Sequence, residues 1–333
     1  MHGDEALWFV GPRRVELRPV ELGGLGRDEV AVRTCCSGVS AGTELLAFRG
    51  QLPADLPLDE SIAALGDGSF DYPFRYGYSA VGVVEALGAD VDRDLAVGDV
   101  VFAFHPHQAR FHVAAEAVVP IGELPPRLAV LLPYVETAFQ VTLDAGPVFG
   151  DDVIVSGLGV LGTLAARLVE RAGARVIAVE PQAWRRELAA DLGLTAVAPG
   201  ELPQVIAERG AAPLAIECSG SPSALAPLLD VVAHEGTALV ASWYGSNEVP
   251  LPLGGAFHRR RLTIRSTQVS TIPAAQSSRW TPARRMARAV ELAPHLPLAA
   301  LATDTVDIAA AAEAYARLDS GSSGVMHVAF GYR

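Results

Sequence analysis

Three histidines, His105, His107 and His112, lie within eight positions of the stretch FAFHPHQARFH. Imidazole nitrogens are common zinc ligands, so this spacing raises the question of a metal site. On a strand, His105 and His107 would share a face and His112 would point the opposite way, although the proline between the first two favours a loop. One interpretation combines the first two histidines with Glu44 or Glu136 around a zinc ion. We favour hydrogen-bonded histidines without a metal, because a catalytic zinc needs three ligands held by outer hydrogen bonds.

A second pattern, in the stretch VIVSGLGVLGTLAARLVERAG, is typical of dinucleotide sites. Gly157, Gly159 and Gly162 form G-x-G-x-x-G directly after a strand-like run and at the start of a helix-like one. The first glycine permits a tight turn, the second lets a pyrophosphate approach the backbone, and the third lets helix and strand pack closely. The helix start at Val160 and Leu161 offers unpaired N–H groups and a positive dipole end to the phosphates. We therefore predict a bound dinucleotide.

The type of dinucleotide depends on Glu180, which lies eighteen residues beyond Gly162 at the end of the next predicted strand. A carboxylate there can accept hydrogen bonds from both ribose hydroxyls of an adenosine, whereas it would repel a 2′-phosphate. This favours NAD over NADP. The alternative is that Glu180 is a solvated strand end and that Arg185 and Arg186 bind a 2′-phosphate.

The composition limits the size, partners and location of the protein. The chain has 333 residues, more than one hydrophobic core usually serves, so we expect two domains. Its net charge of -12 and pI near 5.1 disfavour nucleic acid and anionic membranes as partners. No apolar run reaches about 20 residues, and the acidic first residues do not form a signal peptide. We expect a cytoplasmic protein that acts on a small molecule.

The three cysteines offer neither a disulfide framework nor a zinc knuckle. Cys35 and Cys36 are adjacent, Cys218 is far away in sequence, and no C-x-x-C pattern occurs. We expect all three to be small buried apolar residues.

The elements that must position these residues change in kind along the chain. The first third contains short strand-like runs between glycine and proline turns, at Val15–Val20, Glu29–Thr34, Ala80–Leu87, Val100–Phe104 and Val113–Val119. From about residue 135, apolar strands alternate with alanine-rich helices, with strands at 153–156, 175–179, 214–218 and 237–242 and helices at 161–172, 183–192 and 223–232. Such alternation forms a parallel sheet covered on both faces, so the fold class is α/β with a doubly wound second domain.

The remaining segments frame these two parts. Helices are predicted at 280–292 and 309–318, ahead of a final strand at 325–330. The segment 51–74, rich in Pro, Asp and Gly, is expected to be a surface excursion from the first domain.

Several motifs resemble those of the medium-chain dehydrogenase/reductase superfamily along nearly the whole chain. SGVSAGTELLAFRG (37–50) resembles the family segment G-x-C-G-T-D-x-H-x-x-x-G, and GYSAVGVVEALG (77–88) resembles G-H-E-x-x-G-x-V-x-x-x-G. VGDVV (97–101) is similar to G-D-R-V, and LATDTVDIAAAAEAYARLDSG (301–321) resembles the closing segment. The S-A-G-T-E form is most similar to zinc-ligand-poor members such as the bacteriochlorophyllide dehydrogenases. The resemblance implies an NAD(P)-dependent oxidoreductase with a GroES-like, β-rich catalytic domain (1–134 and 273–333) and a Rossmann domain (135–272).

The resemblance also implies that the catalytic zinc is absent. Ala41 stands where the family has a cysteine ligand, and Pro133 stands at a further ligand position. Tyr78 and Ser79 replace the His and Glu of G-H-E. Alanine and proline offer no ligand atom, and hydroxyl groups are poor replacements for imidazole and thiolate on zinc. The four-cysteine structural zinc lobe of the family is missing as well.

Without the metal, hydrogen-bond donors must stabilise the charge that hydride transfer builds on a substrate oxygen. Tyr78 takes the place of a zinc ligand and should face the cleft as a proton donor. Thr43 resembles the proton-relaying hydroxyl of the family, and His107 could pass the proton to solvent. The alternatives are a Tyr78 that only shapes the pocket and a Thr43 that is a turn hydroxyl. Thr137 resembles a residue near the nicotinamide, and Ser219 follows the fourth strand, where a loop should pass the cofactor.

A basic cluster, His258–Arg261 with Arg265, stands out in the acidic chain. It could bind a carboxylate or phosphate of a substrate, but we favour ion pairs or subunit contacts. The neighbouring run Leu262–Ile264 is expected at the sheet edge, where it could pair across a homodimer as in the resembled family.

Three functions are therefore weighed. The first is a zinc-independent oxidoreductase that interconverts a secondary alcohol and a ketone of an organic substrate with NAD, or with NADP. The second is a zinc-independent reductase of a conjugated C=C bond, as in enoyl and quinone reductases. The third is a nucleotide-binding protein without turnover.

Overall fold

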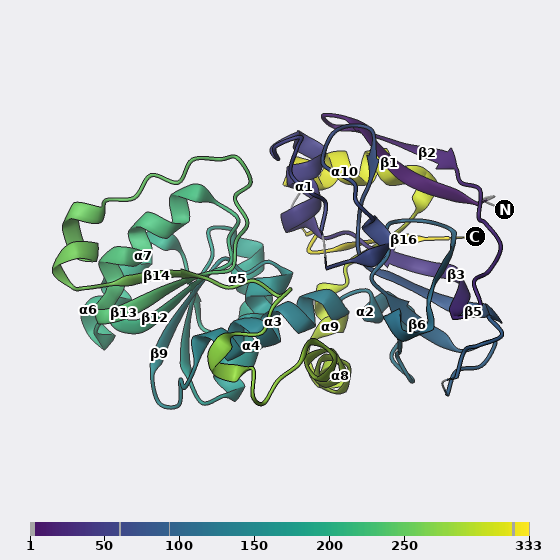
Figure 1. Ribbon diagram of the computed structural model, residues 1–333. Helices are drawn as coiled ribbons and strands as arrows, with labels where there is room; N and C mark the ends of the chain where they lie inside the picture. Colours follow the sequence, from purple (N-terminus) through teal and green to yellow (C-terminus); the bar gives the residue numbers. More distant parts are fainter. Residues whose placement is uncertain (1–3, 60, 93, 322–323, 333) are drawn as a thin grey trace. The chain divides into compact units, whose positions relative to one another are not determined.

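The computed structural model describes residues 4–59, 61–92, 94–321 and 324–332 (Figure 1). Two units are present, and each is described by itself. Unit 1 comprises Met1–Pro133 and Leu298–Arg333, and unit 2 comprises Tyr134–Pro297. No helix in the described part of the chain is long and apolar enough to cross a membrane.

The division differs from the sequence-based domains at one boundary. We expected the first domain to resume at residue 273, but the structure keeps 273–297 in unit 2. The physical reason is α8 (Pro282–Leu292), whose buried Arg285 pairs with Glu136 at 3.0 Å and hydrogen-bonds Gln140, both on α3 (Leu132–Ala145). A buried ion pair of this kind fixes α8 against α3.

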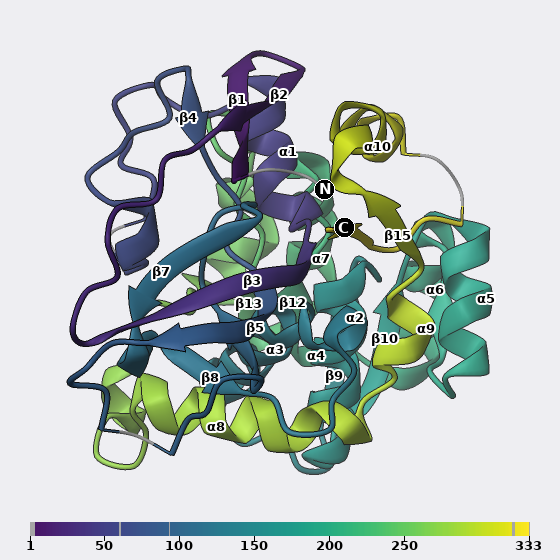
Figure 2. The same cartoon turned by 90° about the vertical axis from the view of Figure 1, so that its right-hand side faces the viewer.

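The main sheet of unit 1 is mostly antiparallel. β3 (Glu29–Gly38) is central and pairs with both β5 and β7, as Figure 2 shows. Along β3 the side chains of Val30, Val32 and Thr34 alternate inward, which is the two-residue period expected of a strand with one buried face. The other strands of this sheet are β5 (Ala80–Leu87), β6 (Val100–Ala103), β7 (Arg110–Ala114), β8 (Val118–Pro120), β15 (Asp304–Asp307) and β16 (Val328–Gly331).

A second, aromatic core of unit 1 lies between a small sheet and two helices. The sheet contains β1 (Glu5–Gly11), β2 (Arg14–Pro19) and β4 (Phe74–Arg75), and the helices are α1 (Ala41–Arg49) and α10 (Ala311–Asp319). The ring of Tyr315 on α10 is stacked on Phe48 of α1, with centroids 5.2 Å apart, and meets Phe9 of β1 edge to face at 5.5 Å. This packing fixes α1, which carries several candidate site residues.

Three expectations for unit 1 need correction. Residues 51–74 are not a mere surface excursion, because Leu58, Leu65 and Phe70 are buried in the aromatic core. The strand expected at 113–119 is divided into β7 and β8 by a single helical turn at Ala115–Ala117. Of the cysteines only Cys36 is buried, whereas the other two are half-buried.

Unit 2 contains a parallel sheet with the order β11-β10-β9-β12-β13-β14 and helices on both faces (Figure 1). This is the doubly wound Rossmann order, and the chain reverses its direction of progress between β9 and β12. The strands are β9 (Asp152–Ser156), β10 (Arg175–Val179), β11 (Ala196–Val197), β12 (Ala212–Glu217), β13 (Val232–Val240) and β14 (Thr263–Ser266). The helices between them are α4 (Val160–Arg171), α5 (Ala183–Asp191), α6 (Leu202–Arg209) and α7 (Leu225–Val231). The predicted α/β fold class is confirmed, and β14 lies at the sheet edge as expected.

Candidate active site

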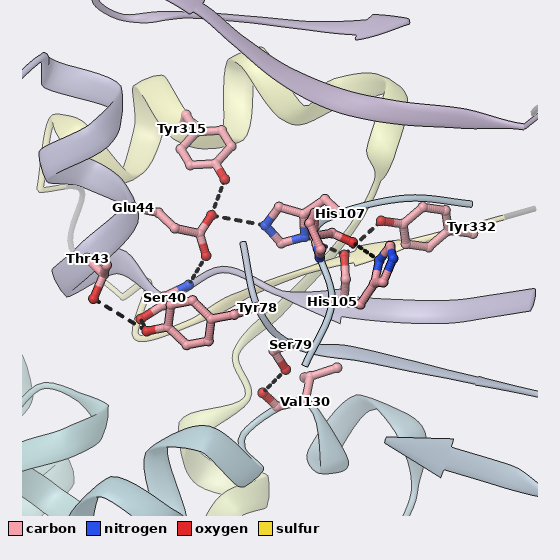
Figure 3. Close-up of polar contacts among 12 residues, drawn as sticks. Ser40, Thr43, Glu44, Tyr78, Ser79, His105, His107, Val130, Tyr315 and Tyr332 are labelled. Carbon is pink, nitrogen blue, oxygen red and sulfur yellow. Dashed lines mark hydrogen bonds and ion pairs between the residues drawn. The ribbon is translucent and has the colours of Figure 1, made fainter. Parts of the chain in front are cut away.

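Three side-chain hydroxyls of unit 1 meet at the start of α1 (Figure 3). The phenol of Tyr78 donates to Oγ of Ser40, and its oxygen lies 3.4 Å from Oγ1 of Thr43. Burial is the main cause that raises the pKa of Tyr78 to about 12. The phenol is therefore protonated at neutral pH and acts as a hydrogen-bond donor. We call Ser40, Thr43 and Tyr78 the hydroxyl cluster.

The fully buried carboxylate of Glu44 shapes this end of α1. Its Oε1 accepts the backbone N–H of Ser40, the N-cap residue, at 2.6 Å. The Ser40 side chain makes no cap bond to the first turn of α1 and instead accepts the phenol of Tyr78. The other oxygen, Oε2, accepts the phenol of Tyr315 and lies 3.0 Å from Nε2 of His107.

His107 is fully buried, so its imidazole has no direct contact with solvent to which it could pass a proton. A carboxylate can only accept, so Nε2 of the imidazole must carry the proton that binds Glu44. On the other side, Nδ1 lies 2.6 Å from Oγ of Ser37, which in turn lies 2.8 Å from the phenol of Tyr332. Gly77 makes room for the ring, since a Cβ there would lie 2.5 Å from Cδ2 of His107.

The histidines do not converge on a metal site. Nδ1 of His105 lies 2.9 Å from the carbonyl oxygen of Pro106, and its ring stacks on Phe111 with centroids 3.9 Å apart. His112 lies on β7, and Glu136 belongs to unit 2, where Arg285 binds it. Within residues 4–59, 61–92, 94–321 and 324–332, no group of three or more His, Cys, Asp or Glu is placed to hold a metal ion.

In unit 2, the glycine turn joins β9 to α4. Gly157 has φ of +90°, and a Cβ there would lie 2.5 Å from Cα of Ser219, so this position requires glycine. A Cβ on Gly162 would lie 1.8 Å from the carbonyl oxygen of Gly157, so helix and turn are in close contact. Gly159, the N-cap of α4, faces open space. The amides at Val160 and Leu161 therefore begin α4 beside room for a ligand.

Glu180 follows β10 and is buried rather than solvated. Its Oε2 accepts the N–H of Leu158 at 2.8 Å and its Oε1 accepts the N–H of Gln182 at 2.9 Å, so it holds the glycine turn in place. Arg185 has a nitrogen 3.8 Å from the carboxylate, and its guanidinium lies over the ring of Trp184 at 5.1 Å.

Arg186 and Thr137 are two further residues that were expected near the cofactor. Arg186 donates to the carbonyl oxygens of Glu180 and Pro181, at 2.8 and 2.7 Å, so its guanidinium is committed to the backbone. Thr137 lies half-buried on α3.

Ser219 lies in the loop after β12, next to the glycine turn. Its N–H donates at 2.7 Å to Oε1 of Glu217, and its hydroxyl donates to the same oxygen. Glu217 is fully buried, and its Oε2 accepts the phenol of Tyr244 at 2.6 Å. Gly220 of the same loop donates its N–H to Ser242 at 2.8 Å. The loops after β12 and β13 are thus joined to each other beside Gly157.

Comparisons with known proteins agree with this arrangement. A family model described as zinc-binding dehydrogenase matches residues 160–288. The D-guloside 3-dehydrogenase of Escherichia coli (strain K12) is 28% identical over 289 residues, which cover 81% of this chain and 82% of that protein. The solved 2R,3R-butanediol dehydrogenase from Bacillus subtilis has a TM-score of 0.80 at 16% identity, over 99% of this chain and 100% of that one. A short chain alcohol dehydrogenase from E. coli CFT073, solved with NADH, has a TM-score of 0.78 at 18% identity over 99% of each chain.

These findings support the medium-chain dehydrogenase/reductase superfamily that the sequence motifs resemble. The same findings support an oxidoreductase rather than a nucleotide-binding protein without turnover.

The positions that resemble the zinc ligands of the superfamily hold other contacts in this member. Ser79 is buried, and its hydroxyl donates at 2.7 Å to the carbonyl oxygen of Val130 (Figure 3). Tyr78 is turned to Ser40 within the hydroxyl cluster. Ala41 is the first residue of α1 and has only a methyl group to offer.

The basic cluster of this superfamily member is largely committed to its own unit. Arg260 donates to the carbonyl oxygens of Asp230 and Val232, at 2.9 and 3.0 Å, and Arg261 pairs with Glu235 at 2.8 Å. Arg265 donates to the carbonyl oxygen of Asp144. The contact of Arg261 is an ion pair of the kind that we favoured, whereas Arg260 and Arg265 are held by backbone carbonyl oxygens.

Sequence reasoning missed several residues that complete the site in unit 1. Ser40 was quoted only as part of S-A-G-T-E, although a serine directly before a helix is an N-cap signal that could have drawn attention to it. Ser37, Tyr315 and Tyr332 gave no local signal, because they reach Glu44 and His107 from distant parts of the chain.

Proposed function

We propose that this protein is a zinc-independent, NAD(P)-dependent oxidoreductase that interconverts a secondary alcohol and a ketone of a small organic molecule. The observation that carries the proposal is the hydroxyl cluster, in which a protonated phenol stands where the superfamily has a metal-binding imidazole. The D-guloside 3-dehydrogenase relative lends support, because its name describes oxidation of an alcohol. Hydrogen-bond donors aimed at the substrate oxygen can stabilise, in place of a metal ion, the negative charge that hydride transfer builds there.

Zinc does not fit the residues at the expected positions. Ala41 has no ligand atom, and the Ser79 hydroxyl already donates to a backbone carbonyl. The carboxylate of Glu44 is fully buried, and three of its four lone-pair sites already accept hydrogen bonds, from Ser40, His107 and Tyr315. We therefore derive no catalytic step through zinc.

A nicotinamide dinucleotide fits unit 2. The open space at Gly159 and the free amides at the start of α4 suit a pyrophosphate, and the solved relative with NADH has the same fold. When bound, the nicotinamide ring gives or takes the hydride. The carboxylate of Glu180 lies beside Leu158 of the glycine turn, and its negative charge would disfavour a 2′-phosphate there, which supports NAD. Arg185 is the residue that would face a 2′-phosphate.

The chain's own residues then handle the proton. In the direction of reduction, the phenol of Tyr78 donates to the substrate oxygen, and Thr43 supplies a second hydroxyl 3.4 Å from the phenol oxygen. Ser40, which accepts from Tyr78, holds the phenol in place. Glu44 and His107 keep the Ser40 backbone fixed beneath it. With a pKa of about 12, the Tyr78 phenol is protonated in nearly every molecule at neutral pH. The proton donor that reduction needs is therefore present, whereas the phenolate that oxidation would need as an acceptor is rare.

The substitution Tyr78→Phe tests this role. We expect turnover with a ketone to fall on the order of 10²- to 10⁴-fold, because the variant keeps the ring and loses only the donor. The matched control is Tyr72→Phe, which removes another half-buried phenol of unit 1, one that donates to the carbonyl oxygen of Ala47. The control should keep near-normal turnover. Normal turnover in Tyr78→Phe would refute the proposed donor.

Metal analysis tests the zinc-independent part of the proposal. We expect purified protein to contain less than stoichiometric zinc and to keep its turnover after treatment with a chelator. Stoichiometric zinc that is lost together with activity would contradict the proposal.

A second candidate is a zinc-independent reductase of a conjugated C=C bond. A neutral Tyr78 phenol stabilises charge on oxygen less than a metal ion does. This favours the second candidate, because an activated acceptor needs less of that stabilisation than a simple ketone. A panel of ketones, enones and quinones with NADH and NADPH separates the two candidates. Turnover confined to enones or quinones would favour the second.

We also propose that the exposed sheet edge at β14 pairs two copies into a homodimer.

A further inference from the structure

Glu217 is a buried carboxylate whose partners are neutral. It lies at the carboxyl end of β12, in register with Ser156 of β9, and is 0% exposed. Three donors reach it: the N–H and hydroxyl of Ser219 and the phenol of Tyr244. None of the ion pairs found in the described part of the chain involves Glu217. Burying a carboxylate without a cation costs free energy, so such a group calls for an explanation.

The charge of this carboxylate acts on its neighbours. The pKa of Tyr244 is raised above its ordinary value, first by burial and then by the hydrogen bond and charge of Glu217. The pKa of Cys218 is raised as well, again by burial first and Glu217 second. The part of each shift that comes from Glu217 is what a negative charge close to the loops after β12 and β13 would produce.

The position of Glu217 relates it to one half of a dinucleotide. In a doubly wound sheet the dinucleotide crosses the crevice at the point where the strand order reverses, here between β9 and β12. The adenosine half belongs to the β9, β10 and β11 side, where Glu180 lies. The nicotinamide half therefore belongs to the side of β12 and β13, where Glu217 closes the strand and Tyr244 follows it.

We propose that Glu217 gives the nicotinamide half of this crevice a fixed negative charge, and that the site therefore favours the oxidised, cationic dinucleotide over the reduced one. The inference rests on the proposed function, since it requires a nicotinamide cofactor in unit 2. The pyrophosphate carries the same charge in both forms, so its interaction with Glu217 cancels when the two affinities are compared. Only the ring differs, being positive when oxidised and neutral when reduced.

The substitution Glu217→Gln tests the inference through binding alone. It keeps the size of the side chain and one acceptor oxygen for Ser219, and it removes the charge. We expect the ratio of the dissociation constants, NAD+ over NADH, to rise about tenfold, as a charge at close range in a protein of intermediate dielectric would produce. Titration calorimetry or quenching of tryptophan fluorescence gives both constants without turnover. If the wild type prefers the phosphorylated pair, NADP+ and NADPH serve as the probes.

Two control variants separate charge from shape. Tyr244→Phe removes one donor and keeps the carboxylate, and Glu187→Gln removes an exposed charge on α5 of the same unit. Both should leave the ratio within about twofold of wild type. An equal weakening of both dinucleotides in Glu217→Gln would show a purely structural role and overturn the inference, and so would an unchanged ratio.

If a thermal melt shows that Glu217→Gln is not folded, the wild type alone still tests the inference. The unmodified protein should bind NAD+ at least as tightly as NADH. A preference for NADH by more than about tenfold would overturn the inference while leaving the proposed function intact. Failure of the wild type to bind any of the four dinucleotides would overturn the proposed function itself, and the inference with it.

Discussion

Two buried histidines of unit 1 should make the protein lose stability as the solution is acidified. His105 is 6% exposed and stacked on Phe111, and His327 is 1% exposed. Burial lowers the pKa of His105 from 6.5 to about 3 and that of His327 from 6.5 to about 4. In the unfolded chain both imidazoles take up a proton below pH 6.5. The unfolded state then binds more protons than the folded state, so the free energy of unfolding must decrease as the pH falls from 6.5 toward 4.

The magnitude follows from the two pairs of pKa values. Between pH 7 and pH 5 the linkage relation gives a loss of about 2 kcal/mol for each histidine, or about 4 kcal/mol together. That is a large share of the roughly 5–15 kcal/mol by which a domain is usually stable. Because the two rings are buried, added salt should change the effect little.

Hydrogen exchange measured by mass spectrometry on peptides from β3 and β16 follows unit 1 separately from unit 2. Protection at these strands should fall between pH 7 and pH 5 after correction for the intrinsic exchange rate. In His105→Gln and in His327→Gln the fall should be smaller by about 2 kcal/mol, whatever the stability of each variant at pH 7. His295→Gln, at an exposed position of unit 2, is the control and should behave as wild type. A fall of the same size in all variants would refute the assignment of the acid sensitivity to these two histidines.

Three further variants test the packing and the cofactor turn. Gly77→Ala should destabilise unit 1 by about 2–4 kcal/mol in a denaturant titration, because φ is +93° and the new Cβ would meet a buried imidazole. Gly98→Ala, with φ of +99° and nothing within 4 Å, should cost only about 1 kcal/mol, and equal losses would contradict the steric account. Arg285→Met should lower the stability of unit 2 by about 3–5 kcal/mol, since it leaves Glu136 buried and unpaired; full stability in a thermal melt would count against the ion pair. Gly159→Ala should melt like wild type but bind NADH at least about tenfold more weakly, and unchanged affinity would argue against a pyrophosphate at this turn.

Local patterns accounted for much of unit 2. The limits of β9, α4 and β10 lie within one residue of the predicted ones, because apolar strands and the glycine turn are encoded by neighbouring residues. Unit 1 was harder to predict for a physical reason. Tyr315 meets Glu44 across 271 positions of sequence, and the aromatic core that brings them together has no local period.

The candidate site illustrates the same limit at the level of single residues. Tyr78 and Thr43 were placed together by the resemblance, and the structure brings them within 3.4 Å. The role given to His107 depended on its exposure, which the sequence could not supply. A histidine in a turn between strands can face water or the interior, and only the positions of Gly77 and Glu44 decide which.

The hydrogen bond from Ser79 to Val130 limits which side chains position 79 can hold. Restoring a carboxylate at position 79 would leave a buried carbonyl without its donor and force a larger side chain into a position that is 3% exposed. The substitution Ser79→Glu alone should therefore weaken unit 1, unless a second change supplies a new donor to the carbonyl oxygen of Val130.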